Sequence, residues 1–375
     1  MPGPPRPLSD ARAWVEVDLG ALVRNARALA AHARVPLVPM VKADAYGLGA
    51  VRVARALEAV APFAYGVSSI PEAIELRDAG ITRPIVLYTP VVLAPAPGGW
   101  TPGDLAALLA HRITPTLAAA ADIAAWQAAA HGAPYHLALD TGMHRAGLPW
   151  TAVGALREVL QTAPPEGVFT HFHSSEADDG SLAQQEARFA EAVAMLPARP
   201  RFVYTDNSGA IVRRAPNPGD LVRPGIFLYG VGSWPAGEGR LVPEPVASLR
   251  ARILELREIA PGEGVSYNAT WRAVRPTRIA TVACGYADGL RRHLGNHAHG
   301  SLHGRPVPIR GVVTMDMAML DVTEVPCAQG DVVTFLGRDG ATLLTAEAVA
   351  TAGGLSPYEL LVGLKLRLPR LYPEA

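Results

Sequence analysis

Residues 38–50 read VPMVKADAYGLGA, an apolar run that ends at a lysine and passes into small residues and glycine. Only Lys42 and Lys365 are lysines, so the other 32 of the 34 basic residues are arginines. A chain that uses arginine for ordinary positive charge needs a lysine where the amine itself must react, because a guanidinium stays protonated. Lys42 is therefore a candidate nucleophile; the alternative is an accident of amino-acid composition.

The apolar run before Lys42 is the first of eight in the first 230 residues. Alanine-rich segments with helical character separate most of them, such as residues 71–80, where Pro71 suits a helix start and Gly80 a stop. Eight strands alternating with helices predict a (β/α)8 barrel. After the seventh run, residues 208–220 leave room for only a short helix. The expected strands are residues 35–43, 63–69, 84–90, 113–117, 135–142, 167–173, 201–207 and 221–230.

The pattern changes near residue 240. Apolar and polar residues then alternate, and the chain turns at proline and glycine, which is typical of antiparallel β-structure. We expect an α/β fold with a TIM-like (β/α)8 barrel in residues 1–240 and a mostly antiparallel β domain in residues 241–375. A strand near residues 13–18 precedes the barrel and could pair with the C-terminal domain.

Composition narrows the possible partners. The 375 residues are 49% hydrophobic, carry a formal net charge of zero at pH 7 and contain no basic block, so neither nucleic acid nor an anionic membrane is expected. No apolar run reaches the roughly 18 residues of a membrane span, and the N-terminus has no signal-peptide core. Cys284 and Cys327 lack metal or redox spacing, which fits a reducing cytoplasm.

Functional groups of such a barrel gather where the strands end. Lys42 ends the first expected strand, Arg145 follows the fifth, His171 ends the sixth, Ser208 follows the seventh and Arg223 belongs to the eighth. In these barrels the loops after strands seven and eight, with a helix N-terminus, usually bind phosphate. A phosphate beside a reactive lysine predicts pyridoxal phosphate held as a Schiff base.

A metal site is the alternative for one of these strands. His171 and His173 are two residues apart, so both would point to the same face of a strand. No further ligand is spaced to complete a coordination shell, and we therefore expect no metal.

Nine stretches of the chain resemble alanine racemase, a pyridoxal-phosphate enzyme of fold type III. They occur in the order of the family and cover nearly the whole chain. The stretches are VKADAYGLG (41–49), DTGMHRAG (140–147), THF (170–172), NSGA (207–210), VRPGIFLYG (222–230), GVSYNATW (264–271), CGYADGLRR (284–292), MDMAMLDVT (315–323) and YELL (358–361).

The resemblance implies a role for individual residues. Lys42 binds the cofactor and is one catalytic base, while Tyr267 is the second base and comes from the other subunit of a homodimer. His171 packs by the pyridine ring and Arg223 faces its nitrogen. The residues that match the cofactor-phosphate contacts are Tyr46, Ser208, Gly225, Ile226 and Tyr358. Those that match the substrate region and its entrance are Arg145, Met315, Asp316 and Tyr286.

The implied activity is racemisation of L-alanine and D-alanine by two bases, supplying D-alanine for peptidoglycan. Arg223 argues against the related decarboxylases, which carry a carboxylate at this place. A broad-specificity or serine racemase of the same fold remains an alternative. A non-catalytic pyridoxal-phosphate homeostasis protein is a third, although such proteins lack the β domain.

Three positions depart from the family pattern. Many relatives have a carbamylated lysine at the position of Ala138, which orients the arginine that corresponds to Arg145. Here an anion such as chloride, or water, would have to take that role. Tyr204 replaces a common histidine beside the pyridine-side arginine, and Thr314 replaces a common cysteine.

Overall fold

Six parallel strands form most of the wall of the N-terminal domain, in the order β2-β3-β4-β5-β7-β8. The structure, a computed structural model, describes residues 11–93, 102–232 and 241–373. Each of the six strands lies within one of the stretches expected from the sequence, and a short strand, β6 (Leu148–Pro149), pairs beside β5. The six strands are β2 (Tyr65–Val67), β3 (Ile85–Pro90), β4 (Ile113–Leu117), β5 (His136–Asp140), β7 (Gly167–Phe169) and β8 (Phe202–Tyr204).

The first and eighth expected strands are wrong in detail. Residues 35–43 and 221–230 contain no regular strand, and they close the barrel through isolated bridges. Val38 N donates to Val222 O over 2.8 Å, so the two segments still lie edge to edge. Pro36, Pro39 and Pro224 each remove an N–H donor, which prevents a continuous ladder. The bridges are Leu37–Val222, Met40–Gly66 and Asn207–Arg223.

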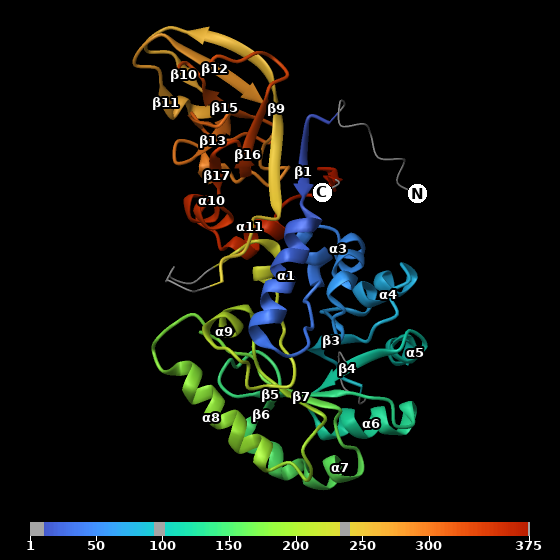
Figure 1. Cartoon of the computed structure of the whole chain (residues 1–375). Coiled ribbons are helices and arrows are strands. Elements are labelled where there is room, and N and C mark those ends of the chain that lie inside the picture. Colours follow the sequence, from blue (N-terminus) through green and yellow to red (C-terminus); the bar gives the residue numbers. More distant parts are fainter. Residues whose placement is uncertain (1–10, 94–101, 233–240, 374–375) are drawn as a thin grey trace.

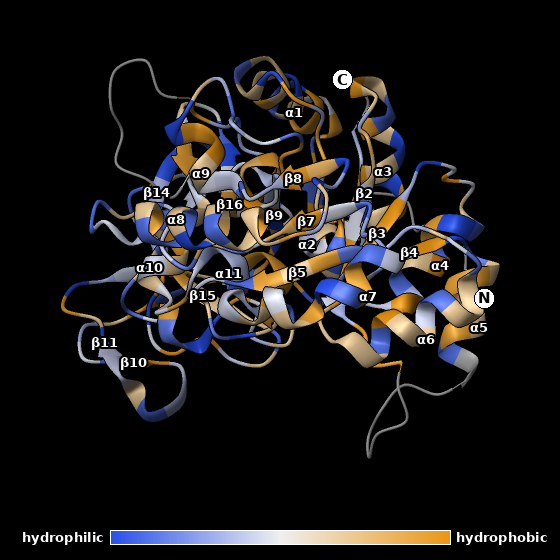
Figure 2. Ribbon diagram, turned by 90° about the horizontal axis from the view of Figure 1, so that it is seen from below, coloured by the Kyte–Doolittle hydropathy of each residue, from blue (hydrophilic) through white to orange (hydrophobic). Residues whose placement is uncertain are grey.

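Helices surround the apolar strands when the barrel is seen from its end (Figure 2). Ser69 and Glu72 form a capping box at the start of α4, and the chain leaves that helix at Ala79, next to the predicted stop at Gly80. The segment after β8 holds only the six-residue α9, as expected. The helices of this domain are α1 (Leu19–Ala33), α2 (Lys42–Gly47), α3 (Ala50–Leu57), α4 (Ile70–Asp78), α5 (Pro102–Ala110), α6 (Ala120–Ala130), α7 (Arg157–Thr162), α8 (Ser181–Ala194) and α9 (Ser208–Arg213).

The β domain stacks on one end of the barrel, and its main sheet has the order β14-β13-β16-β9-β1-β18 (Figure 1). The long strand β9 pairs with β1, β12 and β16, all antiparallel. β1 pairs on its other edge with β18 in parallel, so the two ends of the chain meet in this sheet. The strands of this sheet are β1 (Ala13–Val17), β9 (Ala247–Ile259), β12 (Thr277–Val282), β13 (His299–Leu302), β14 (Arg305–Pro308), β15 (Ala318–Asp321), β16 (Val332–Asp339), β17 (Thr342–Leu344) and β18 (Arg370–Leu371).

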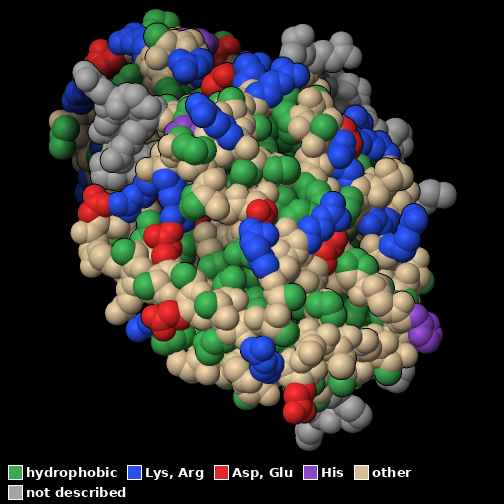
Figure 3. Space-filling model, turned by 60° about the horizontal axis from the view of Figure 1, so that its bottom comes forward, with side chains coloured by type: hydrophobic (Ala, Val, Ile, Leu, Met, Phe, Trp, Pro, Cys, Tyr) green, Lys and Arg blue, Asp and Glu red, His purple; other side chains and the backbone are tan. Residues whose placement is uncertain are grey.

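Two helices, α10 (Ala346–Ala352) and α11 (Pro357–Val362), lie between the β sheet and the barrel (Figure 1). On the face shown in Figure 3, positive and negative side chains are interspersed among hydrophobic ones. None of the helices in the described ranges is long and apolar enough to cross a membrane.

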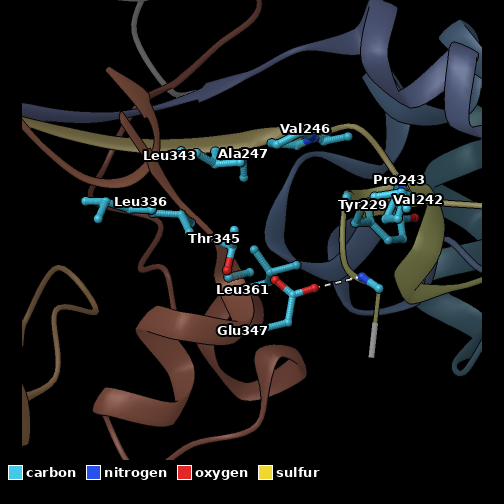
Figure 4. A pocket seen from close by; sticks show the side chains of 16 residues that line it. Tyr229, Val242, Pro243, Val246, Ala247, Leu336, Leu343, Thr345, Glu347 and Leu361 are labelled. Atoms are coloured by element: carbon cyan, nitrogen blue, oxygen red, sulfur yellow. Dashed lines mark hydrogen bonds between the residues drawn. The ribbon is translucent and has the colours of Figure 1, made fainter. Parts of the chain in front are cut away.

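A small, mainly apolar cavity of about 150 Å³ lies between the two domains and is lined by residues of both (Figure 4). At its edge the Glu347 carboxylate accepts a hydrogen bond from Gly232 N over 2.8 Å, which ties α10 to the barrel side. Tyr229 lines this cavity and also stacks on Tyr46, with ring centroids 4.5 Å apart. The Tyr229–Tyr46 stack therefore connects the junction between the domains to the larger cavity described below, which Tyr46 lines.

Candidate active site

A cavity of about 500 Å³ lies at the carboxyl end of the barrel strands. It brings together nine of the residues singled out in the sequence, from segments spread between residues 42 and 358. Four others, all in the β domain, are not part of its lining. The nine are Lys42, Tyr46, Arg145, His171, Ser208, Arg223, Gly225, Ile226 and Tyr358, and the four are Tyr267, Tyr286, Met315 and Asp316.

Lys42 stands at the start of an unusual turn. The next four residues, 43–46, all have left-handed backbone conformations, with φ between 52° and 58°. A left-handed turn of non-glycine residues costs roughly 1–2 kcal/mol per residue, so neighbouring groups must hold it. Ala43 N donates to Glu72 Oε1 over 2.8 Å, and Ala50 N donates to Asp44 Oδ1 over 2.6 Å. The turn places Lys42 at the cavity wall and Tyr46 inside it; no local sequence pattern predicted this.

The surroundings of Lys42 lower the pKa of its amine below the usual 10.5. The largest cause is burial, which disfavours the ammonium form, and the charges of Arg145 and then Arg223 act in the same direction. Glu72 opposes them more weakly. A larger fraction of the amine is therefore neutral near pH 7, as a nucleophile or a base requires.

Arg223 is buried in the cavity lining and forms no ion pair with a carboxylate among the described residues. Its Nη2 donates to Thr170 O over 2.7 Å and to Thr205 O over 2.8 Å, and its Nη1 lies 3.3 Å from His171 Nδ1. Burial and the Arg223 charge lower the pKa of His171 to about 2, so this imidazole is neutral and accepts the hydrogen bond. Arg223 Nε is buried and has no partner in the described part of the chain, which leaves one donor for a bound group.

Three aromatic rings surround the Arg223 guanidinium. Its central carbon lies 5.2 Å from the ring centre of Phe169, 5.5 Å from that of Tyr88 and 5.8 Å from that of Tyr204. The Tyr204 hydroxyl contacts His136 Nδ1 at 2.6 Å and the Tyr88 hydroxyl at 3.1 Å, not the arginine. The electron-rich ring faces therefore stabilise the cation where no anion lies beside it.

Ala138 is buried in a hydrophobic cluster with Val86, Phe169 and Tyr204. Arg145 is solvent-exposed at the cavity rim and makes no hydrogen bond or ion pair with any residue in the described ranges. Occupation of the neighbourhood of Arg145 by chloride or water stays a prediction.

The loops after β8 and around residue 225 are joined by hydrogen bonds and form a cradle at the cavity. Ser208 Oγ accepts hydrogen bonds from Gly225 N over 2.9 Å and Phe227 N over 3.4 Å. Gly225 precedes a short 3-10 helix, η4 (Ile226–Tyr229). A Cβ on Gly225 would lie only 2.5 Å from Tyr46 Oη, so any larger residue would fill the cradle. This geometry suits a phosphate group.

The four β-domain residues lie elsewhere. Tyr267 begins η5 (Tyr267–Ala269) with 69% of its side chain exposed, and Met315 is 54% exposed. Tyr267 lines a separate hollow together with Thr314 and Met317. A single copy of the chain therefore supplies the barrel cavity with Lys42 but not with Tyr267.

An ion-pair network that the sequence did not suggest fixes the loop before β15. Arg367 Nη2 donates to Asp316 Oδ1 and its Nε to Asp288 Oδ1, both over 2.6 Å. Arg12 Nη2 donates to the same Asp288 oxygen over 2.7 Å. Asp288 is fully buried, and both arginines compensate its charge. Asp316 is thus tied to the β domain's own core.

Comparisons with known proteins agree over the whole chain. The family models described as "Alanine racemase, N-terminal domain" and "Alanine racemase, C-terminal domain" match residues 17–233 and 246–372. The alanine racemase of Synechocystis sp. is 38% identical over 96% of this chain and 98% of its own length. That of Nostoc sp. is 34% identical over 96% of this chain and 95% of its own.

Solved structures give the same result. Alanine racemase from Bartonella henselae with covalently bound pyridoxal phosphate superposes with a TM-score of 0.85 at 31% identity, covering 97% of this chain and 100% of that one. Alanine racemase from Bacillus anthracis with bound L-Ala-P gives a TM-score of 0.86 at 31% identity, covering 99% of this chain and 96% of that one.

Proposed function

The chain belongs to the alanine racemase family and is an amino-acid isomerase, and on that basis we propose that it interconverts L-alanine and D-alanine with pyridoxal phosphate and two catalytic bases, Lys42 and Tyr267. The observation that carries the proposal is the cavity that a lysine of lowered pKa shares with Arg223, whose buried Nε has no partner among the described residues.

The residues of the cavity fit this cofactor. Lys42 would bind it covalently, the Arg223 Nε donor would face the pyridine nitrogen, and His171 would pack by the ring. Gly225 lies so close to the Tyr46 hydroxyl that the cradle has no room for a Cβ there. The phosphate would be held by Tyr46, Ser208, Gly225, Ile226 and Tyr358. When bound, pyridoxal phosphate supplies an electron sink for the carbon that loses its proton.

Arg223 limits that electron sink. A guanidinium stays protonated, so Arg223 would donate a hydrogen bond to a neutral ring nitrogen and would oppose protonation there. A carboxylate in its place would favour the protonated ring and a longer-lived negative charge on the substrate. The aromatic rings around Arg223 stabilise its charge, so no carboxylate is needed beside the guanidinium. Side reactions such as transamination are thereby disfavoured.

Racemisation removes a proton from one face of the substrate carbon and returns one to the other face. A single base would have to move around the substrate, whereas two bases on opposite faces need no such motion. The Lys42 amine takes or returns the proton on its own side. Arg145, an exposed cation at the rim that pairs with no residue in the described part of the chain, would bind the substrate carboxylate and stabilise an ionised tyrosine nearby.

The second base calls for a second copy of the chain. Tyr267 is largely exposed and lies outside the lining of its own chain's cavity, as do Met315, Asp316 and Tyr286. We infer a homodimer in which Tyr267 of each protomer enters the other's cavity, while the loop of Met315 and Asp316 covers the substrate region and Tyr286 lines the entrance.

Two alternatives are not favoured. The β domain matches the family over residues 246–372, whereas a pyridoxal-phosphate homeostasis protein would lack it. The relatives compared here are named for alanine, which favours alanine over serine as substrate. We assign the D-alanine to peptidoglycan synthesis and the enzyme to the cytoplasm, where the free thiols Cys284 and Cys327 would persist.

Racemisation assays across a panel of amino acids test the function, and alanine should give the highest kcat/KM. Lys42→Arg should lose at least about 10³-fold in activity, because a guanidinium cannot bind the cofactor covalently. Lys365→Arg is the control, since it exchanges the chain's other lysine at an exposed position and should keep its activity. Full activity in Lys42→Arg, or faster turnover of serine, would contradict the proposal.

A further inference from the structure

We propose that Arg370, together with Tyr372, is a positioning residue for Lys42: it clamps the left-handed turn that carries the lysine to the segment that follows α11. Neither residue lines the cavity. The proposal deepens the proposed function, on which its catalytic consequence rests.

The left-handed turn is strained and receives support at its far end from the last residues of the chain. Arg370 Nε donates to Gly47 O over 3.0 Å, and the Tyr372 hydroxyl donates to Leu48 O over 2.9 Å. Four consecutive non-glycine residues with positive φ persist only when surrounding contacts determine them. Arg370 and Tyr372 therefore act on the backbone that sets the direction of Lys42 and Tyr46.

The same guanidinium also binds the segment that follows α11. Its Nη1 donates to Lys365 O over 2.6 Å and to Leu368 O over 2.8 Å, and its Nη2 donates to Leu364 O over 2.7 Å. These carbonyls follow directly on α11, which carries Tyr358 at the cavity. One rigid, planar group thus sets the distance between the turn of Lys42 and the helix of Tyr358.

The turn packs closely against the residues that it contacts near the C-terminus. A Cβ on Gly47 would lie 2.8 Å from Leu361 O, and one on Gly49 would lie 2.0 Å from Tyr372 Oη. Both glycines also have positive φ, of 83° and 96°. The turn therefore packs backbone to backbone against the end of α11, and a shift of one moves the other.

Arg370 is itself fixed by the β domain. It opens β18, which pairs in parallel with β1 through Val15. All four of its acceptors are neutral carbonyls, and burial lowers the pKa of its guanidinium. The Asp44 carboxylate of the turn attracts the guanidinium and opposes this effect of burial more weakly. The forked donors of Arg370, which reach carbonyls on both the turn and the segment after α11, fix the geometry of the contact.

The chain offers a matched control for a purely structural role. Arg77, on α4, is also partly buried, has a pKa lowered by burial, and donates only to backbone carbonyls. It lies outside the cavity lining. Its acceptors are His111 O (2.8 Å), Ile81 O (2.8 Å), Arg83 O (2.7 Å) and Arg112 O (3.0 Å).

The experiment compares Arg370→Met, Arg370→Lys and Tyr372→Phe with Arg77→Met and Arg77→Lys. Three quantities are measured: the Tm, the amide hydrogen exchange of residues 42–50 in the ligand-free protein, and the affinity of that protein for pyridoxal phosphate. Tyr372→Phe removes one hydroxyl and keeps the ring, so it remains informative should Arg370→Met fail to fold.

We expect faster exchange of residues 42–50 and about tenfold weaker cofactor binding in Arg370→Met and Tyr372→Phe, because small displacements of a site residue are amplified in its function. Arg370→Lys should recover part of both, since an ammonium can still reach some of the carbonyls. The Arg77 variants should lower Tm to a similar extent and leave exchange in 42–50 and cofactor affinity unchanged.

The clamp would be overturned if the Arg370, Tyr372 and Arg77 variants bound the cofactor with equal affinity. It would also be overturned if the exchange rate of residues 42–50 depended only on the Tm of each variant. Failure of the proposed function looks different, because the wild-type protein itself would then not bind the cofactor or racemise alanine. The exchange comparison in the ligand-free protein decides the clamp in either case.

Discussion

At the scale of single residues, the site depends on cations that form no ion pair within the described ranges. Lys42, Arg145 and Arg223 share one cavity, and the two arginines help to lower the pKa of the lysine. In the proposed function, the charge of Arg145 would meet the carboxylate of the substrate and that of Arg223 the ring nitrogen of the cofactor. In the ligand-free protein this arrangement opposes folding, as uncompensated like charges do.

This gives a pH-dependent prediction for stability. Because the pKa of Lys42 is lowered in the folded state, the unfolded chain binds more protons between that pKa and 10.5, so the charge of Lys42 destabilises the fold at neutral pH. Lys42→Met should raise the Tm of the ligand-free protein by about 1–3 °C at pH 7. The difference should shrink as the pH rises toward the pKa of the unfolded lysine. Calorimetry at several pH values measures the difference in Tm between the variant and the wild type. If that difference does not vary with pH, the increase in Tm comes from the apolar side chain and not from the loss of the charge.

At the scale of elements, the phosphate cradle depends on two loops that approach too closely for a side chain. Ser208 at the start of α9 and Gly225 before η4 are joined by a hydrogen bond of 2.9 Å. Tyr46 cannot easily give way, because its buried ring stacks on Tyr229. Ser208, Gly225 and Tyr46 therefore hold one another in place around the cradle.

Gly225→Ala tests the cradle. The new methyl group would meet Tyr46 Oη and displace it from the phosphate position, so the affinity for pyridoxal phosphate should fall about tenfold or more. Gly154→Ala is the control, since its Cβ would meet no atom closer than Met195 Sδ at 3.9 Å. Cofactor titration of the two purified variants gives the measurement. Unchanged affinity in Gly225→Ala would show that the phosphate binds elsewhere.

At the scale of the whole molecule, the proposed site draws on residues of both domains. The barrel supplies the cavity, and the β domain presents Tyr267 and Met315 on its surface. If Tyr267 is the second base, as we propose, the site is completed by pairing with a second chain, and a two-fold dimer would achieve this for both sites at once.

Mixing two inactive variants tests the shared site. In a heterodimer of Lys42→Ala and Tyr267→Phe, one site carries both substitutions and the other carries neither. Racemase activity should recover to about a quarter of the wild-type value after random exchange of equal amounts, because half of the dimers then have one intact site. Each variant alone serves as the control. No recovery despite demonstrated subunit exchange would place both bases within one chain.

The sequence by itself determined the fold class and most of the cavity. Local alternation of apolar runs and helical segments predicted six strands where the structure has them, and parallel strands bring their carboxyl ends to one rim. Lys42 was singled out because lysine is rare in this chain, and Arg223 and Ser208 because they stand near expected strand ends. These inferences need only neighbouring residues and the direction of the chain.

Only the tertiary structure decided how the barrel closes and how the site is held. The prolines at 36, 39 and 224 leave bridges in place of two strands, and the left-handed turn after Lys42 has no local signal. Tyr204 bonds to His136 and contacts Arg223 only through its ring, while Arg370 reaches Gly47 from the far end of the chain. Each of these is a contact between residues remote in sequence, and it exists because packing of the whole molecule outweighs local backbone preference.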